Sequence, residues 1–391
     1  MAIKTIKNFY SNKREATRKT NEEKSFMAPE RNWSKGIRTL YSKYERHIGT
    51  LTIITGFIFD NLTLREASID AQTMVFIIYL ILSGVSILFL HFLESREKKE
   101  NKGYLHFWVF LLMQFTIGGL FSMFFVFYSR GFALSASWPF LLFLFANLVG
   151  NELLKKEYTR LSLQVSLYFI GIFSFFIYYI PVILHEMDDK IFIYSGLASL
   201  ITVFIFMRLL ELIYFKRVNR SRLKIGFGVL TFYILINIFY FTNVIPPVPL
   251  VMKDGGVYHN LSVNNRGDYI AYKEPISEWN IFNEYPAYNK IQGESVYVIT
   301  SVYAPAKFGT QVIHDWQYYN ENSKKWISAS RIFVPIIGGR EGGYRFYSVK
   351  QNITPGIWRV DVETLRGQNI SRIKFEIVDA DFTPNFEQVI Y

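Results

Sequence analysis

Long apolar segments dominate the first part of the chain. A helix that crosses the hydrocarbon core of a bilayer needs about 20 apolar residues. Several stretches approach or reach that length between short charged loops: residues 73–92, 104–128, 134–149, 161–184, 191–212 and 225–244. A shorter stretch, residues 48–64, contains Asp60 and Asn61 and is counted as a further span. The pattern predicts a membrane all-α bundle of about seven transmembrane helices over residues 47–244.

Beyond residue 244 the pattern changes to short alternating runs. Pro246, Pro247 and Pro249 end the helical pattern. Six runs with strand-like alternation follow, separated by turn-forming residues: 295–303, 311–319, 326–334, 344–350, 357–364 and 370–378. Short strands at this spacing predict an all-β, sandwich-like domain over residues 295–391, preceded by a linker with irregular and strand-like sequence over residues 245–294.

The last two runs give the clearest hairpin. Along residues 357–364 the apolar positions Trp358, Val360 and Val362 alternate with the charged positions Arg359, Asp361 and Glu363. Side chains alternate between the two faces of a strand, so one face is expected to form core and the other to face solvent.

The placement of basic residues predicts the orientation in the membrane. The segment 1–46 and the loops 94–102, 151–160 and 216–224 together hold 24 Lys and Arg, whereas the intervening loops hold three. Loops rich in Lys and Arg stay in the cytoplasm. The N-terminus is therefore predicted to be cytoplasmic, and an odd number of spans places the β domain on the extracytoplasmic side of the plasma membrane.

The same distribution accounts for the formal net charge of +11, which falls entirely within the first 243 residues. No nucleic-acid partner is needed to explain it, and we expect none. The basic tail, residues 1–46, is a candidate for binding anionic lipid. The chain has no cysteine, which excludes disulfides, thiolate metal sites and cysteine nucleophiles.

Ionisable residues inside a membrane segment are costly and are candidates for function. Asp60 and Asn61 lie near the outer end of the first span, either at a solvated helix end or in a polar contact within the bundle. Arg208 and Glu211 are three residues apart, on one helix face where they can pair. Their position near the cytoplasmic interface favours a snorkelling arginine.

Three polar residues in the predicted outer loops are further candidates: Asp70, His185 and Asp188. The side chains of the loop 185–189 suit a cation, but no third ligand is identified for zinc, so no metal and no cofactor are predicted. A solvated loop is the favoured interpretation for the segment 185–189.

Aromatic residues of the β domain suggest a binding surface. The candidates are His314, Trp316, Tyr344, Arg345 and Tyr347. Such residues can form a stacking platform for sugar rings or peptide, but aromatic side chains in short strands more often form core. No Ser, Cys or carboxylate is spaced to form a catalytic triad with His314, so a hydrogen-bonded histidine in the core or at its rim is favoured.

Several motifs of the β domain resemble a known family. They are His314-Asp315-Trp316, the run 344–348, the run 356–362, Gly367 and Phe375. Over roughly residues 310–378 the chain resembles a bacterial domain catalogued as domain of unknown function 2914 (DUF2914), and residues 44–47 and 56–64 resemble the start of its accompanying multi-span half. The resemblance implies an envelope protein with the β domain outside the membrane, and it implies no catalytic residues.

These observations favour an integral plasma-membrane protein whose β domain binds an envelope partner, either a protein or a cell-wall glycan, without catalysis. One alternative is a polytopic enzyme or transporter with a site at the outer membrane face under the β domain, using Asp60, Asp70, His185 or Asp188. Another is a transmembrane sensor coupled to the basic tail.

Overall fold

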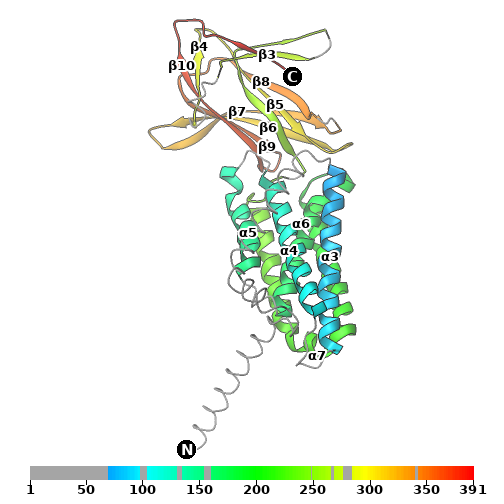
Figure 1. Cartoon of the computed structure of the whole chain (residues 1–391). Helices are drawn as coiled ribbons and strands as arrows, with labels where there is room; N and C mark the ends of the chain where they lie inside the picture. Colours follow the sequence, from blue (N-terminus) through cyan, green and yellow to red (C-terminus); the bar gives the residue numbers. More distant parts are fainter. Residues whose placement is uncertain are drawn as a thin grey trace, which may run out of the picture. The chain divides into compact units, whose positions relative to one another are not determined.

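The computed structural model describes residues 69–96, 104–129, 134–153, 160–247, 249–265, 268–275, 284–339 and 342–391. The basic tail and the weak first span, with Asp60 and Asn61, lie outside these residues. The described helices are α3 (Ile69–Arg96), α4 (Tyr104–Ser129), α5 (Leu134–Leu153), α6 (Leu161–Leu184) and α7 (Asp189–Phe241), shown in Figure 1.

The prediction of about seven helices is wrong in its count, because the described residues form five. Four of these, α3, α4, α6 and α7, are long and apolar enough to cross a membrane. The apolar part of α5, Trp138–Leu148, is shorter than that. The last two predicted spans, residues 191–212 and 225–244, both fall within α7.

Helix α7 folds back on itself, which explains this merging. Tyr214 has a non-helical backbone, with φ −145° and ψ 67°. The two ends of α7 meet: the rings of Phe192 and Tyr240 stack with centroids 3.6 Å apart, and the Tyr240 hydroxyl donates to Asp189 Oδ1 at 3.2 Å. A straight helix of 53 residues would hold its ends about 80 Å apart. The chain therefore reverses near Tyr214, and α7 consists of two antiparallel arms.

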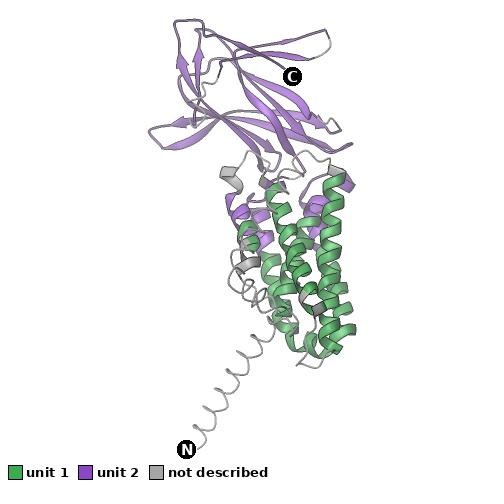
Figure 2. Cartoon of the chain, in the orientation of Figure 1, with its two compact units in different colours: residues 1–126, 144–175, 197–234 green, residues 127–143, 176–196, 235–391 purple. Residues whose placement is uncertain are grey.

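The chain divides into two compact units (Figure 2). The first comprises residues 1–126, 144–175 and 197–234, and its described part is helical. The second comprises residues 127–143, 176–196 and 235–391, so it contains every described strand together with the α6–α7 loop and both ends of α7.

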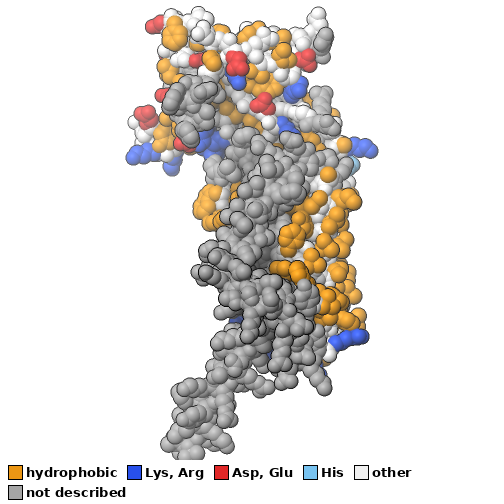
Figure 3. Space-filling view, viewed as in Figure 1, with side chains coloured by type: hydrophobic (Ala, Val, Ile, Leu, Met, Phe, Trp, Pro, Cys, Tyr) orange, Lys and Arg blue, Asp and Glu red, His pale blue; other side chains and the backbone are white. Residues whose placement is uncertain are grey.

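Large apolar side chains cover the outside of the helices. In Figure 3 hydrophobic side chains cover much of the visible, described surface of the helices, and charged side chains are frequent among the strands. Exposed examples are Met74, Ile81, Phe115, Ile201, Phe204 and Phe227. A continuous apolar surface of this kind marks a protein or membrane interaction site.

The strands form three sheets. One sheet pairs β1 (Val251–Tyr258), β5 (Val296–Tyr303) and β8 (Tyr344–Lys350), in the order β1-β5-β8. A five-stranded sheet has the order β4-β10-β9-β6-β7; its strands are β4 (Ala287–Lys290), β6 (Gly309–Asn320), β7 (Lys325–Ile337), β9 (Gly356–Thr364) and β10 (Asn369–Asp379). The third has the order β11-β3-β2, from β11 (Glu387–Ile390), β3 (Tyr269–Lys273) and β2 (Asn260–Val263).

The expectation of a β-rich C-terminal region is confirmed. The six predicted runs coincide with β5 to β10, with boundaries that differ by at most three residues. The segment 245–294 contains four further strands, and β1 pairs with β5 over its whole length. Strands of the first two sheets contribute to a shared core, in which Val298 of β5 packs in one cluster with Trp316, Trp358 and Phe375.

The charged face of the β9–β10 hairpin is less exposed than predicted. Asp361 is only 2% exposed, and Arg372 clamps it with two hydrogen bonds of 2.6 Å, from Nε to Oδ1 and from Nη2 to Oδ2. Asp315 on the neighbouring strand β6 pairs in register with Asp361 and is also buried. Adjacent strands and long side chains cover this face, so polar partners replace the expected solvent.

Candidate functional site

The β domain contains a cavity of about 420 Å³. Its walls come from β1, β4, β10 and the C-terminal segment, with lining residues that include Asp254, Gly256, Tyr258, Glu274, Tyr288, Asn289, Lys374, Phe375 and Tyr391. This volume lies within the range of about 300–1,000 Å³ usual for ligand pockets. The combination of aromatic walls and a few polar groups is also typical of such pockets.

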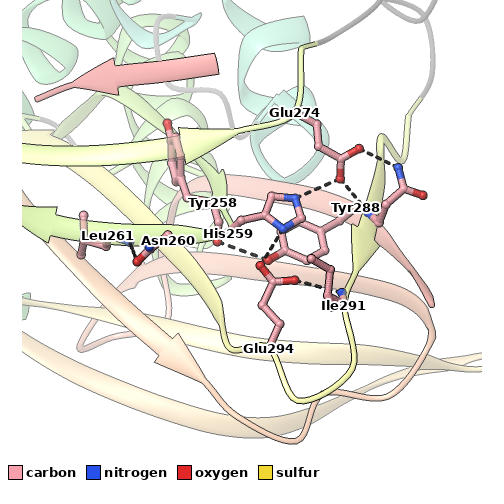
Figure 4. A network of polar contacts seen from close by, with 9 residues as sticks. Tyr258, His259, Asn260, Leu261, Glu274, Tyr288, Ile291 and Glu294 are labelled. Carbon is pink, nitrogen blue, oxygen red and sulfur yellow. Dashed lines mark hydrogen bonds and ion pairs between the residues drawn. The ribbon is translucent and has the colours of Figure 1, made fainter. Parts of the chain in front are cut away.

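One wall is braced by a buried histidine (Figure 4). His259 follows β1 directly and is only 4% exposed. Its Nε2 lies 3.0 Å from Glu274 Oε1 and its Nδ1 lies 2.8 Å from Glu294 Oε1. The imidazole stacks on the ring of Tyr288, with centroids 4.0 Å apart. The histidine thereby joins three chain segments and fixes the plane of the Tyr288 ring.

Both carboxylates of this network have additional donors. Glu274 Oε1 accepts the backbone N–H of Asn289 at 2.7 Å, and Oε2 accepts the Asn289 side-chain amide at 2.6 Å. Glu294 Oε2 accepts the backbone N–H of Ile291 at 3.0 Å. Burial raises the pKa of the Tyr288 hydroxyl, and the two carboxylates add to this effect, so the phenol stays protonated.

The lining also contains a tyrosine pair. The hydroxyl groups of Tyr258 and Tyr391 are hydrogen-bonded, and their rings meet edge to face with centroids 5.9 Å apart. A Cβ at Gly256 would lie 2.9 Å from the Tyr258 hydroxyl, so a glycine suits this position. Burial raises the pKa of both tyrosines, which keeps their hydroxyls neutral.

Most charged groups of the lining have internal partners. Lys374 pairs with Glu284, and Lys273 Nζ lies 4.0 Å from Glu387 Oε2. Glu274 is held in the histidine network described above. Asp254 differs, because its Oδ1 accepts the backbone N–H of Gly255 at 2.7 Å and its carboxylate is exposed. The cavity is therefore polar, with paired lysines and one exposed carboxylate.

The arrangement favours binding over covalent chemistry. The contacts of His259 are with carboxylates and aromatic rings, and none of them is a hydroxyl or thiol nucleophile. Within the ranges that the structure describes, no group of three His, Asp or Glu side chains is placed to hold a metal ion.

The five residues predicted for a binding surface do not gather on one face. His314 and Trp316 are fully buried in the core, and Tyr344 packs against a core cluster. Arg345 and Tyr347 lie on the opposite face of β8, where Tyr347 is 41% exposed and its ring meets Tyr269 edge to face at 5.7 Å. The alternation of side chains along β8 separates the two groups.

His314 belongs to a buried hydrogen-bond chain. The indole N–H of Trp316 donates to Ser348 Oγ at 2.9 Å, Ser348 Oγ lies 2.7 Å from His314 Nδ1, and His314 Nε2 lies 2.9 Å from Thr300 Oγ1. Burial lowers the pKa of His314 to about 3, so its imidazole is neutral in the folded domain.

The outer-loop candidates have local structural contacts. His185 Nδ1 lies 2.8 Å from the carbonyl oxygen of Val182, and Asp188 caps α7 by accepting the backbone N–H of Ile191 at 2.8 Å. Asp70 lies in the first turn of α3. A space of about 20 Å³, enough for one water molecule, lies beside Asp188.

The helical candidates Arg208 and Glu211 pair as their spacing suggests, with Arg208 Nη1 2.9 Å from Glu211 Oε2. The arginine side chain is 56% exposed and lies over the ring of Phe204. This geometry fits a snorkelling side chain.

The sequence reasoning missed a second polar cluster, in the helical unit. Glu94 Oε2 lies 3.0 Å from His91 Nδ1, and Glu94 Oε1 lies 3.4 Å from His106 Nε2. Arg217 pairs with Glu94, and Gln164 Oε1 lies 2.8 Å from His91 Nε2. Side chains of three helices thus meet at one carboxylate, and Gln164 of α6 joins the cluster through His91. The i,i+3 spacing of His91 and Glu94 was its only local signal.

Comparison with known proteins agrees with the resemblance seen in the motifs. The family model described as protein of unknown function (DUF2914) matches residues 309–377, from the start of β6 into β10. No protein with a curated description matches the chain. Among solved structures, the Pseudomonas fluorescens alkylpurine DNA glycosylase AlkC bound to DNA containing an abasic site analog aligns at 8% identity. The alignment covers 78% of this chain and 99% of that chain, with a TM-score of 0.20 that is too low to indicate a common fold. The chain thus contains a C-terminal region that matches a domain family of unknown function.

Proposed function

We propose that the chain is an integral plasma-membrane protein that presents its β domain on the extracytoplasmic side and binds an envelope partner, a protein or a glycan, in the cavity bounded by β1, β4 and β10. The observation that carries the proposal is this preshaped cavity of about 420 Å³, whose walls are braced by the His259 network. Aromatic walls with a few polar groups are typical of ligand-binding pockets.

The helices support a membrane location. Four of them are long and apolar enough to span a bilayer, and large apolar side chains on their outer surfaces would suit lipid. The fold-back of α7 brings both of its ends together, and residues near both ends contact the β domain: Met187 packs on its core and Asn243 bonds Arg366. The β domain and the α6–α7 loop therefore share one side of the membrane in this proposal.

Photo-crosslinking in the native envelope tests the proposal. Ala287 lines the cavity and is exposed, so p-benzoylphenylalanine at this position should capture the occupant in cells that produce the full chain. The same amino acid at Ala329, exposed on β7 and absent from the cavity lining, is the matched control. Adducts from position 287 alone support the proposal. The absence of adducts from position 287, or identical adducts from both positions, contradicts it.

A second candidate function, a transmembrane sensor, is favoured by the joint around Arg366. This residue, in the β9–β10 turn, forms an ion pair with Asp189, lies 4.1 Å over the Tyr240 ring and donates from Nε to Asn243 Oδ1 at 3.2 Å. A shift of the hairpin on ligand binding would thus act directly on both ends of α7.

Cysteine labelling distinguishes the sensor from a passive binder. If the joint transmits a signal, the labelling rate of Asn219→Cys, exposed on the second arm of α7, should change when the cavity is occupied. Adding Arg366→Ala should abolish the change. If the labelling rate of Asn219→Cys does not change when the cavity is occupied in the chain that retains Arg366, the sensor role is excluded.

A further inference from the structure

The chemistry of the cavity identifies the class of its occupant. We propose that it binds a neutral saccharide, about one or two sugar rings in size. This inference rests on the proposed function, because it names the partner of the same site.

Size and wall composition are the first argument. Sugar rings present apolar C–H faces and hydroxyl groups on their edges. The rings of Tyr258, Tyr288, Phe375 and Tyr391 provide apolar surface at the cavity walls. The tyrosines also carry neutral hydroxyls, which can both donate and accept hydrogen bonds.

Charge balance is the second argument. The lysines of the lining pair with Glu284 and Glu387, and Glu274 is bonded to His259 and Asn289. At the two lysines and Glu274, a charged ligand would have to displace one of these partners or remain uncompensated, and a buried charge without a partner is strongly unfavourable. A neutral ligand with many hydroxyl groups can bond to the remaining lone pairs of the same carboxylates without breaking the pairs.

The exposed carboxylate of Asp254 is the third argument. Gly255 and Gly256 form part of the lining on β1, but the side chains of Met252 and Tyr258 fill the space beside them and cover their backbone. Asp254, next to this stretch, is exposed and offers a carboxylate to the ligand hydroxyls.

Direct binding tests the inference. Full-length chain in detergent is titrated by isothermal calorimetry with cellobiose, maltose and N,N′-diacetylchitobiose, and in parallel with chitobiose, digalacturonic acid and the peptide Ala-Ala-Ala. We expect at least one neutral disaccharide to bind, and none of the charged sugars or the peptide. Ala287→Trp should weaken this binding by at least about tenfold, while Ala329→Trp changes it by less than about twofold. Unchanged melting temperatures of both variants show that folding is retained.

Failure of the inference is separable from failure of the proposed function. No binding of neutral disaccharides, binding of the charged sugars or the peptide alone, or an equal effect of the two tryptophan variants would overturn the saccharide inference. If position 287 still yields protein adducts in the native envelope, the proposed function stands and only its ligand class is wrong. If position 287 yields no adducts and no sugar binds, both are wrong.

Discussion

The buried His314 makes the acid stability of the β domain predictable. Its ring lies in the core between Thr300 and Ser348, and burial lowers its pKa from 6.5 to about 3. In the unfolded chain the imidazole becomes protonated below its ordinary pKa, whereas in the folded domain it stays neutral. The unfolded state therefore binds one more proton between these two pKa values, and the stability contributed at pH 7 is lost as the pH falls toward 3.

The magnitude follows from the size of the shift. Each pH unit below 6.5 costs about 1.4 kcal/mol from this single group, so the step from pH 6.5 to pH 4.5 costs about 3 kcal/mol. A His314→Gln variant has no titrating group at this position. At pH 7.5 it should be less stable than the natural chain by about 1–3 kcal/mol, because the hydroxyls of Thr300 and Ser348 lose their ring partner.

Denaturant unfolding of the full chain in detergent, followed by near-ultraviolet circular dichroism at pH 7.5 and pH 4.5, measures this effect. The stability advantage of the natural chain over His314→Gln should fall by about 3 kcal/mol between the two pH values, so that it vanishes or reverses at pH 4.5. Parallel profiles, with the same difference at both pH values, would show that His314 takes up a proton as readily in the folded domain as in the unfolded chain, and would refute the reasoning.

Three further predictions concern other polar groups. Burial, with Asp361 and Asp315 nearby, raises the pKa of Glu363 from 4.5 to about 7. The protonated carboxyl therefore stabilises the folded domain at low pH, and this stabilisation is lost as the pH rises through 7. In the same unfolding assay, Glu363→Gln should gain stability relative to the natural chain between pH 5 and pH 8, and a stability difference that stays the same over this range would contradict the prediction. Glu94→Gln removes the carboxylate shared by two histidines and Arg217, and it should lower the melting temperature of the solubilised chain more than Glu94→Asp does. Arg366→Ala should cost about 1–2 kcal/mol through the lost ring contact and ion pair, against a smaller cost for Arg366→Lys, and equal costs would contradict the geometry.

The strands that could be predicted from the sequence are the long ones. Each of the strands β5 to β10 is at least seven residues long. Their apolar side chains recur at regular intervals, so the two-residue period of a strand can be recognised in the sequence. The strands β2, β4 and β11 have four residues each, too few to establish a period. β1 is longer, but Gly255 and Gly256 interrupt its apolar pattern.

Sequence reasoning located little of the candidate site. His259 meets Glu274 and Glu294 at separations of 15 and 35 residues, and such contacts depend on the pairing of strands that were not predicted. Trp316, one of the binding-surface candidates, fits the core interpretation that is more common for aromatic side chains, because its face of β6 packs against β5 and β10. The reversal at Tyr214 also has no local signal, since neither Gly nor Pro occurs between residues 197 and 225.

Extracytoplasmic exposure of the β domain is the central claim, and cysteine labelling tests it most directly. The chain has no native cysteine, so single substitutions suffice. Ser323 is exposed in the β6–β7 turn, and Asn219 is exposed in the segment predicted to face the cytoplasm, so a cysteine at either position can be labelled. Ser371 is fully buried and would be unsuitable. With an impermeant maleimide on intact cells, Ser323→Cys should react, and Asn219→Cys should react only after lysis. The reverse result would contradict the account.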